Sequence, residues 1–232
     1  MVPEVQAKIL AKIAGSDGMR YSEAYPGEEI DDDLYNYHLQ EMVKRGLLTK
    51  ENSIYKLTNK GKQEVTYINS NGDDLGRFKV ITILVVTRNN NKEILVQKRN
   101  RHPHRGEIST ISGRVMVGEK VVEAAKRRLK EEAGLEANFE HWGDFRAIRK
   151  TANGKLFEDI IFCICKADEP TGELVSHSEY GENWWDKFDK IFEYLNDDVA
   201  VAKIEKIMLA KIKNNKKSGA VIEEEEIILT DY

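Results

Sequence analysis

The stretch that decides the fold is GRVMVGEKVVEAAKRRLKEEAGL, residues Gly113 to Leu135. Its apolar residues recur at spacings of three and four, which is the pattern of one buried helical face. They are Val121, Val122, Ala124, Ala125, Leu129 and Ala133. The pattern predicts a helix that begins near Lys120 and ends at Gly134, because glycine tolerates the positive φ that commonly ends a helix.

Three charged positions of this predicted helix share one face, because side chains three and four residues apart lie one above the other. They are Arg128, Glu131 and Glu132. The ordinary interpretation of the two glutamates is a solvated, acidic last turn. The arginine can pair with both carboxylates, and a guanidinium in that place partly neutralises the charge that would attract a divalent cation.

The stretch resembles the signature box of the Nudix family. The family pattern runs Gly, five residues, Glu, seven residues, Arg-Glu, an apolar residue, any residue, Glu-Glu, any residue, Gly and an apolar residue. The positions on register are Gly113, Glu119, Arg127, Leu129, Glu131, Glu132, Gly134 and Leu135. Two expected acids are missing, because Arg128 replaces a metal-binding Glu and Met116 stands where the family usually has another acid.

The resemblance implies a Nudix α/β/α sandwich with a mixed sheet, and a nucleoside diphosphate derivative as ligand. In family members with an intact box, the carboxylates hold Mg²⁺ or Mn²⁺, which screens the phosphates and activates a water. Glu131 and Glu132 are the implied metal ligands, whereas Arg128 and Met116 argue against a bound ion. The implied ligand-binding residues are Arg99, Arg101, Gly113, Arg114, Glu119, Arg127 and Arg128.

Nudix hydrolases usually recruit a further Glu from outside the box as general base. In this chain the resemblance implies Glu179 or Glu182, which lie just ahead of Trp184. Either would deprotonate or orient the attacking water. The alternative is that both are exposed loop acids, which is the commoner fate of a Glu. With Glu131 and Glu132, these two complete the candidate catalytic set.

Strands are predicted on both sides of the box. They are residues 78–87, residues 93–98 after a turn at 89–91, and residues 156–166 after the Asn153-Gly154 turn. Arg99 and Arg101 follow the second strand, and their planar guanidinium groups suit a diphosphate. The alternative for this segment is a solvated loop.

The sequence after residue 180 predicts further elements of the same domain. We expect a short strand or turn at Trp184 and Trp185, a helix over 186–195 and a final strand over 227–229. The residues between predict an amphipathic helix over 199–213. This helix covers the sheet or meets a second copy of the chain, so a homodimer is one expected partner.

A polar, turn-rich stretch, INSNGDDLG at 68–76, separates these strands from a helical unit. We therefore divide the chain into a first domain at 1–68, a linker at 69–76 and a second domain at 77–232. In the first domain the pattern predicts helices over 5–13, 21–25 and from Asp31 or Asp32 to Arg45, with Gly46 ending the last. Strands at 47–49 and 54–57 and a helix from Asn59 follow.

This order resembles a winged helix-turn-helix, which gives an α+β fold class for the whole chain. The resemblance places the third helix in the major groove of DNA. The implied groove contacts are Tyr35, Asn36, His38 and Gln40, and the implied phosphate contacts are Lys50, Lys56 and Lys60. Residues 1–70 hold nine Lys or Arg against eleven Asp or Glu. This balance opposes DNA binding and leaves protein contact as the alternative.

Composition limits the kinds of protein that this chain can be. The 232 residues are 41% hydrophobic and 33% charged, which suffices for one sizeable core and a small one. There is no apolar run long enough for a bilayer and no secretory pattern at the start, so we expect a cytoplasmic protein without a membrane partner. Cys163 and Cys165 alternate along an apolar strand and are interpreted as core residues. The histidines that we do not assign to a metal are His38, His102, His104 and His141.

Two hypotheses from different classes follow. The first is a regulator in which a nucleotide-derived small molecule such as ADP-ribose binds the Nudix domain and changes DNA binding by the winged helix. Known Nudix-type regulators support this by analogy, but in them the winged helix follows the Nudix domain. The second is a Mg²⁺-dependent hydrolase that cleaves a nucleoside diphosphate linked to another group, with Arg128 as a clamp on the phosphate.

Overall fold

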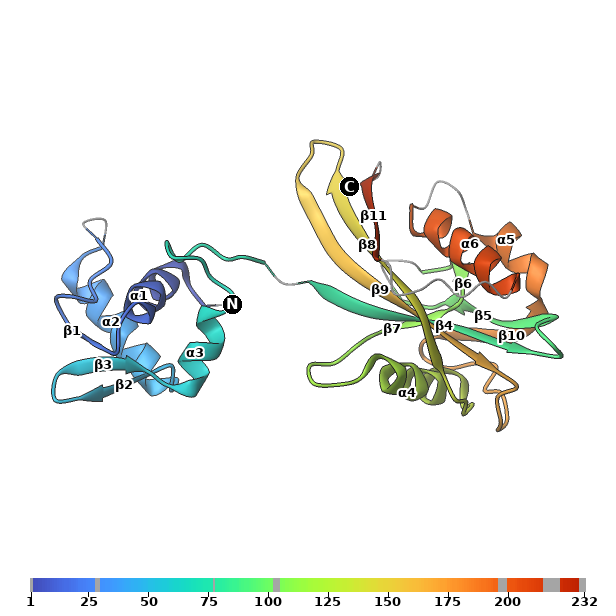
Figure 1. The fold of residues 1–232 in the computed structure, drawn as a ribbon, viewed down its shortest axis with the longest axis horizontal. Coiled ribbons are helices and arrows are strands. Elements are labelled where there is room, and N and C mark those ends of the chain that lie inside the picture. The colour runs from blue at the N-terminus through green and yellow to red at the C-terminus, as the bar shows by residue number, and fades with distance from the viewer. Residues whose placement is uncertain are drawn as a thin grey trace. The chain divides into compact units, whose positions relative to one another are not determined.

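Two units make up the chain, residues 1–77 and residues 78–232, and each is described by itself (Figure 1). The computed structural model describes residues 2–27, 30–76, 78–101, 105–195, 200–214 and 222–229, with backbone only for 200–204 and 222–229. His102 and His104 therefore lie outside the described residues.

The first unit contains three helices and a small sheet. In chain order these are α1 (Glu4–Ala14), β1 (Met19–Arg20), α2 (Asp32–Lys44), β2 (Leu48–Glu51), β3 (Ile54–Leu57) and α3 (Asn59–Val65). The antiparallel sheet has the order β1-β3-β2. This arrangement is compatible with a winged helix. The predicted helix at 21–25 is wrong, because these residues form a turn, and strand β1 was not predicted.

Local chemistry explains the boundaries of α2 and of the hairpin. The Asp31 side chain accepts a hydrogen bond from the Leu34 amide at 2.7 Å, so it caps α2 as predicted. Between β2 and β3, Asn52 and Ser53 both have positive φ. Two such residues form the turn whose twist matches a two-residue hairpin, which sets the pairing of Glu51 with Ile54.

The predicted linker at 69–76 is largely folded onto the first unit. The Asn69 amide donates to Asp73 O and the Leu75 amide to Tyr67 O, both at 2.9 Å. Gly72 packs so closely on α1 that a Cβ there would lie 2.7 Å from Lys8 Cα. These residues are therefore part of the first unit rather than a free connector.

The second unit is a mixed sheet with helices on both faces. Its first half contains β4 (Lys79–Arg88), β5 (Glu93–Arg99), β6 (Ile108–Ser109), β7 (Ile111–Arg114) and α4 (Val121–Ala133). Its second half contains β8 (Glu140–Thr151), β9 (Leu156–Asp168), β10 (Gly181–Lys187), the 3-10 helix η1 (Phe188–Lys190), α5 (Ile191–Tyr194), α6 (Ala200–Lys213) and β11 (Ile222–Leu229). The sheet order is β10-β5-β4-β9-β8-β11, with β6 on β5 and β7 on β4.

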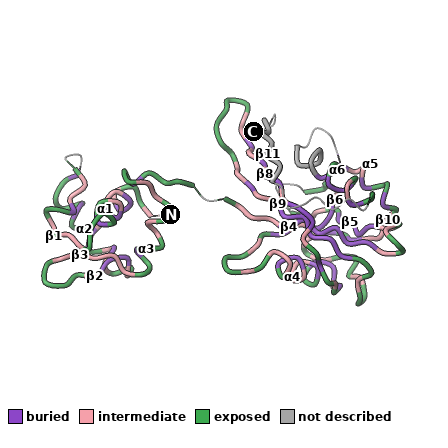
Figure 2. Tube along the Cα trace, in the orientation of Figure 1, coloured by how far each residue is buried: buried purple, intermediate pink, exposed green. Residues whose placement is uncertain are grey.

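The layers of this unit are visible in Figure 1, where α4 lies on one face of the sheet and α5 and α6 on the other. Strands β4 and β9 are parallel, as are β8 and β11, and the other pairs are antiparallel. One core packs α4 through Ala125 and Leu129. The other packs the opposite face through residues such as Phe188 and Met208. The predicted α/β/α sandwich with a mixed sheet is confirmed, and Figure 2 shows its buried strands.

Two predicted boundaries in this unit need correction. The predicted helix at 186–195 begins two residues late, because Asp186 and Lys187 continue β10 opposite Ile94 and Glu93, and it starts as the 3-10 helix η1 before the four residues of α5. At Asp186 and Lys187, pairing with β5 thus outweighs the helical pattern of the sequence. The predicted final strand begins earlier, at residue 222. Cys163 and Cys165 are buried and free, as expected of core residues.

None of the helices in the described part of the chain combines the length and the apolar character that crossing a lipid bilayer demands.

Candidate functional site

The helix of the box forms as predicted. Lys120 occupies the N-cap position of α4 without a capping hydrogen bond from its side chain, and Gly134, at φ 72°, ends the helix in the left-handed conformation. Ala124, Ala125 and Leu129 are fully buried against the sheet. The face that carries Arg127, Arg128 and Glu131 is left for polar contacts.

Glu119 and Arg127 hold the loop before α4. Arg127 donates to both Glu119 oxygens, from Nε at 2.8 Å and from NH2 at 2.9 Å, and also to Arg114 O at 3.1 Å. The Met116 amide donates to Glu119 Oε2 at 2.9 Å. The hydrogen bonds from Arg127 and from this amide lower the pKa of Glu119 to about 2. Glu119 and Arg127, both predicted to contact the ligand, therefore bind each other and fix the shape of the loop.

Arg128 lies on the two carboxylates that follow it. Its NH1 donates to Glu131 Oε2 at 3.0 Å, and its NH2 donates to Glu132 Oε1. Glu131 is also 3.3 Å from Arg127 NH1. The Arg128 side chain crosses Gly113, where a Cβ would lie 2.5 Å from Arg128 Cδ. Gly113 is therefore required by this arginine, in addition to its place in strand β7.

Glu132 is almost completely buried, with 2% of its surface exposed. Gln97 Nε2 donates to its Oε2 at 2.9 Å, and Asn183 Nδ2 donates to its backbone oxygen at 2.8 Å. Burial raises the pKa of Glu132, although the Arg128 guanidinium acts in the opposite direction. The sequence interpretation missed Gln97 and Asn183. Gln97 had a signal, since it is a polar residue that directly follows the apolar run Ile94 to Val96 within β5.

Arg99, at the end of β5, lies between two buried carboxylates. Its charge acts on Glu132 and on Glu205, a buried residue of α6. NH1 donates to Ser112 Oγ at 3.1 Å, whereas Nε is buried and makes no hydrogen bond within the described residues. Glu205 accepts from Thr110 Oγ1 at 2.7 Å. Arg99 therefore lies beside the box as expected. Its contact with a ligand stays a prediction, and its buried Nε is a donor that such a ligand could use.

Tyr180 links the box to the segment after β5. Its ring lies under two guanidinium groups, with Arg101 and Arg128 each 4.9 Å from the ring centre. Arg101 also pairs with Glu179. Among the described residues, Arg101 and Tyr180 therefore connect Glu179 to the box, and the Glu179 carboxylate is exposed.

Glu182 faces away from the box carboxylates. Successive side chains of a strand point to opposite faces, and the neighbouring Asn183 bonds Glu132. Glu182 is exposed opposite Lys98. The structure therefore does not bring Glu182 to Glu131 and Glu132, and its role as general base stays a prediction without support from this geometry. Arg114, the last residue of β7, and Met116, in the loop before α4, are both exposed.

The first unit corrects one predicted DNA contact. Tyr35 is fully buried, and its hydroxyl donates to Tyr21 O at 2.7 Å. Its ring packs on Tyr21 and Tyr25 with centres 4.7 and 5.1 Å away. Burial raises its pKa. Tyr35 is a core residue and cannot reach a groove, because the helical face that carries it points inward.

The other predicted DNA contacts lie at the surface of the first unit. Asn36 and Gln40 are exposed on one face of α2, 3.4 Å apart between Oδ1 and Nε2. His38 is half-buried beside Gln6. The three lysines all have partners: Lys50 lies over the Tyr55 ring, Lys56 pairs with Glu51, and Lys60 donates to Arg45 O.

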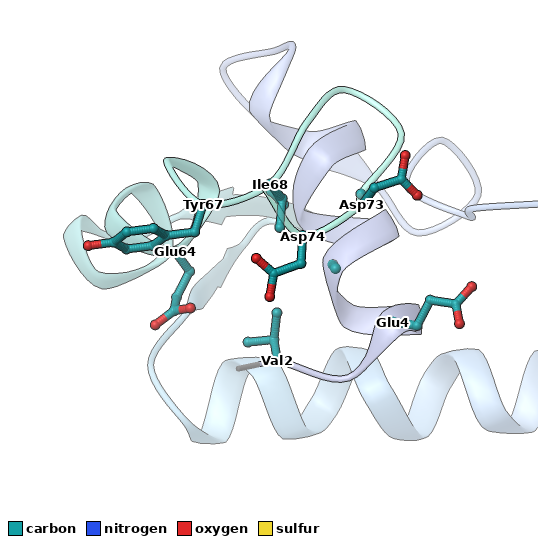
Figure 3. A pocket seen from close by; sticks show the side chains of 9 residues that line it. Val2, Glu4, Glu64, Tyr67, Ile68, Asp73 and Asp74 are labelled. Atoms are coloured by element: carbon teal, nitrogen blue, oxygen red, sulfur yellow. The ribbon is translucent and has the colours of Figure 1, made fainter. Parts of the chain in front are cut away.

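A hollow of about 270 Å³ lies between α1, α3 and the turn after α3. Figure 3 shows the carboxylates of Glu4, Glu64, Asp73 and Asp74 around it. Four acids would repel a phosphate, so this hollow does not suit a nucleotide.

Comparisons with known proteins concern the second unit. Residues 78–207 match the family model of the NUDIX domain. No curated protein matches the chain. A MutT protein from Bacillus halodurans is similar in structure, with 23% identity, a TM-score of 0.52, and coverage of 66% of this chain and 92% of that chain.

Two other solved structures are similar at lower scores. A Nudix hydrolase from Nitrosomonas europaea has 16% identity and a TM-score of 0.48, over 65% of this chain and 80% of that chain. A MutT Nudix hydrolase from Burkholderia pseudomallei has 24% identity and a TM-score of 0.46, over 56% of this chain and 98% of that chain. At 23% identity, the likeness to the Bacillus halodurans protein shows a shared fold and nothing further.

Proposed function

This chain belongs to the Nudix family, and from that premise we propose that its Nudix domain binds a nucleoside diphosphate derivative such as ADP-ribose with weakened or lost hydrolysis. The observation that carries the proposal is the position of Arg128. Nudix hydrolases use divalent metals, and the acids that would hold one here already accept hydrogen bonds from guanidinium groups.

The residues present do not fit a hard divalent cation. Mg²⁺ takes oxygen ligands in a nearly ideal octahedron, whereas here a cationic side chain stands among the oxygens. One Glu132 oxygen is occupied by Arg128 and the other by Gln97. A metal ion would have to displace Arg128, whose side chain is 19% exposed and lies against Gly113. An internal counter-ion thus replaces the metal in this site.

Two unused donors support an anionic ligand. Nε of Arg99 and Nε of Arg128 are buried without a hydrogen-bond partner in the described part of the chain. Unsatisfied buried donors are costly, and a phosphate offers several acceptor oxygens that match the guanidinium fork. Tyr180, between Arg101 and Arg128, offers an aromatic surface beside them. Together these groups suit a diphosphate joined to an aromatic base.

The test is a thermal-shift titration of the full chain with ADP-ribose, with Mg²⁺ and with EDTA. Because a ligand of the folded state raises the apparent stability, we expect a shift of equal size in both conditions. Arg99→Gln should abolish the shift. Lys98→Gln is the matched control, since Lys98 precedes Arg99 and is exposed on the other face of β5. A shift that needs Mg²⁺, or that survives Arg99→Gln, would overturn the proposal.

The second candidate is a hydrolase that cleaves a nucleoside diphosphate linked to another moiety. It is favoured by Glu131, which keeps 38% of its side chain exposed on the face of Arg128. Arg128→Glu distinguishes the candidates, because it restores three carboxylates on one face. If only the variant hydrolyses substrate with Mg²⁺, the parent is a binding domain. Lys130→Glu makes the same charge change on an exposed position and should leave the parent's behaviour intact. Robust turnover by the parent would establish the hydrolase.

For the first unit we propose DNA binding regulated by the ligand of the Nudix domain. The order of its elements supports a winged helix, with Asn36 and Gln40 on the exposed face of α2. Fluorescence anisotropy with labelled duplex DNA at several salt concentrations tests this. Lys60→Gln should lower the salt slope by about 1, as expected for one phosphate contact. Lys8→Gln on α1 is the control. If the affinity for DNA does not change when ADP-ribose is added, the regulation is contradicted, because a ligand coupled to DNA binding must change that affinity.

A further inference from the structure

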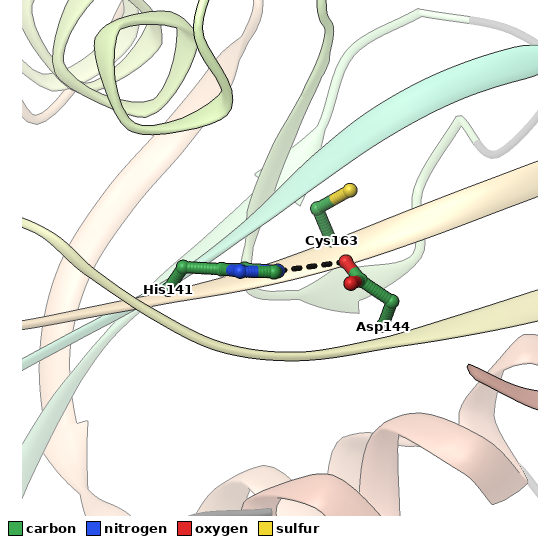
Figure 4. Close-up of side chains that lie close together, drawn as sticks. All are labelled: His141, Asp144 and Cys163. Carbon is green, nitrogen blue, oxygen red and sulfur yellow. Dashed lines mark hydrogen bonds and ion pairs between the residues drawn. The ribbon is translucent and has the colours of Figure 1, made fainter. Parts of the chain in front are cut away.

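A second polar cluster lies in the Nudix domain, outside the box. His141 and Asp144 come from β8 and Cys163 from β9, and their ligand atoms all lie within 4.8 Å of one another. His141 Nε2 is 2.7 Å from Asp144 Oδ1. Figure 4 shows the three side chains converging from the two strands. Nitrogen, oxygen and sulfur donors of three residues therefore meet at one point.

An irregularity of β8 creates this cluster. On a regular strand, residues three apart point to opposite faces of the sheet. The register shifts between His141 and Gly143, so Trp142 has no partner of its own on β9. This bulge turns His141 and Asp144 to the same face, and Asp144 then lies directly opposite Cys163. Bulges of this kind often re-aim a side chain next to a functional site.

An unused donor lies beside the cluster. Thr82 of β4 is paired in register with Cys163, so both side chains point to the same face. Thr82 is fully buried, and its Oγ1 makes no hydrogen bond of ordinary geometry with the described residues, although it lies next to the Cys165 thiol. A buried hydroxyl without a regular partner is rare. It can donate to the sulfur of Cys165 or to a water bound beside the cluster.

We propose that His141, Asp144 and Cys163 bind a divalent metal ion of intermediate softness, with Zn²⁺ as the representative ion. Imidazole, carboxylate and thiolate are the ligand types of zinc sites, and three protein ligands leave the fourth position to water. The donor set excludes Mg²⁺, because thiolate sulfur is too soft for that ion. The site is independent of the function proposed for the box.

The surroundings fit such an ion. The side chain of His141 is 38% exposed and that of Asp144 17% exposed, whereas Cys163 is buried. Solvent therefore reaches the cluster at its histidine end. Binding of the ion as a thiolate complex releases the Cys163 thiol proton to solvent.

The experiment uses the untagged full chain, freed of metal and titrated with Co²⁺ as a spectroscopic substitute for Zn²⁺. We expect one ion per chain, a thiolate-to-cobalt charge-transfer band, and loss of this band and of the bound cobalt when Zn²⁺ is added. Mg²⁺ at the same concentration should displace nothing. Cys163→Ser should remove the charge-transfer band, and Asp144→Asn should weaken binding about tenfold or more.

Cys165→Ser is the matched control, because Cys165 is equally buried on the same face of β9, opposite His141. This variant should keep the full band. Circular dichroism of each variant shows that it is folded, and His141→Gln provides a second test at an exposed position, where a folding defect is least expected. The proposal is overturned if the parent binds no Co²⁺, if Cys163→Ser keeps the band, or if Cys165→Ser loses it.

Discussion

Two neighbouring arginines of α4 make contrasting pairs with glutamate. Arg127 bonds Glu119 at the rim of the loop, where their side chains are 32% and 17% exposed. Arg128 bonds Glu132, whose side chain is 2% exposed. The pKa of Glu119 is lowered to about 2, whereas the pKa of Glu132 is raised. The pKa values of the two carboxyl groups therefore shift in opposite directions, because desolvation of Glu132 outweighs its attraction to the guanidinium.

The largest difference should appear when each arginine is removed. Arg128→Met leaves a buried carboxylate without its counter-ion, and we expect the free energy of unfolding at neutral pH to fall by about 3 kcal/mol. Urea unfolding measures this loss. The second substitution Glu132→Gln, added to Arg128→Met, should recover most of it, because no charge is then left buried. If the double variant is no more stable than Arg128→Met, the loss comes from packing instead.

Gly113→Ala tests the buried pair of Arg128 and Glu132 from strand β7, on which the Arg128 side chain lies. The added methyl would lie 2.5 Å from Arg128 Cδ, so the side chain must move off Glu132. Overpacking of this kind costs about 2 kcal/mol, and urea unfolding again measures it. Arg128→Met should make the same alanine nearly neutral, since a flexible Met side chain can move aside. An equal cost in both backgrounds would place the strain in the backbone of β7.

This contrast also explains what the sequence could predict. The apolar spacing and Gly134 sufficed for the helix and its end, because these features follow from periodicity and backbone geometry. The sandwich was implied only by the resemblance of residues 113–135 to the Nudix box. The pairing of Arg128 with both acids also followed from helical spacing. The burial of Glu132 did not, because it depends on Gln97 and Asn183, which come from two other strands.

Strand pairing limited the remaining predictions in the same way. Glu182 was misplaced because the face of β10 is set by its register with β5, which the order of residues does not contain. Tyr35 was misplaced because α2 packs it on Tyr21 and Tyr25. The cluster of His141, Asp144 and Cys163 depends on a bulge, so its residues have no recognisable spacing.

Lowering the pH should have opposite effects on the contributions of Glu119 and Glu132 to the free energy of unfolding. Glu119 has a folded pKa below its ordinary value of 4.5, so its contribution is complete above pH 4.5 and is lost as the pH falls towards 2. Glu132 has a folded pKa above its ordinary value, so stability increases as the pH falls through the interval between that raised pKa and 4.5. The urea midpoint of Glu119→Gln should lose the first dependence, and that of Glu132→Gln the second. A Glu132→Gln profile parallel to the parent's would contradict the raised pKa.

The smallest loss is expected for the rim pair. Arg127→Met leaves Glu119 in contact with solvent, so its charge can be rehydrated, and we expect a loss of about 1 kcal/mol at neutral pH. Salt should reduce the difference between variant and parent, because exposed charges are screened. The corresponding difference for Arg128→Met should change little with salt, since Glu132 is buried. Urea unfolding at low and high salt measures both. If Arg127→Met costs as much as Arg128→Met and is equally insensitive to salt, then the hydrogen bonds of Arg127 to the loop, and not the exposure of its partner, determine its contribution.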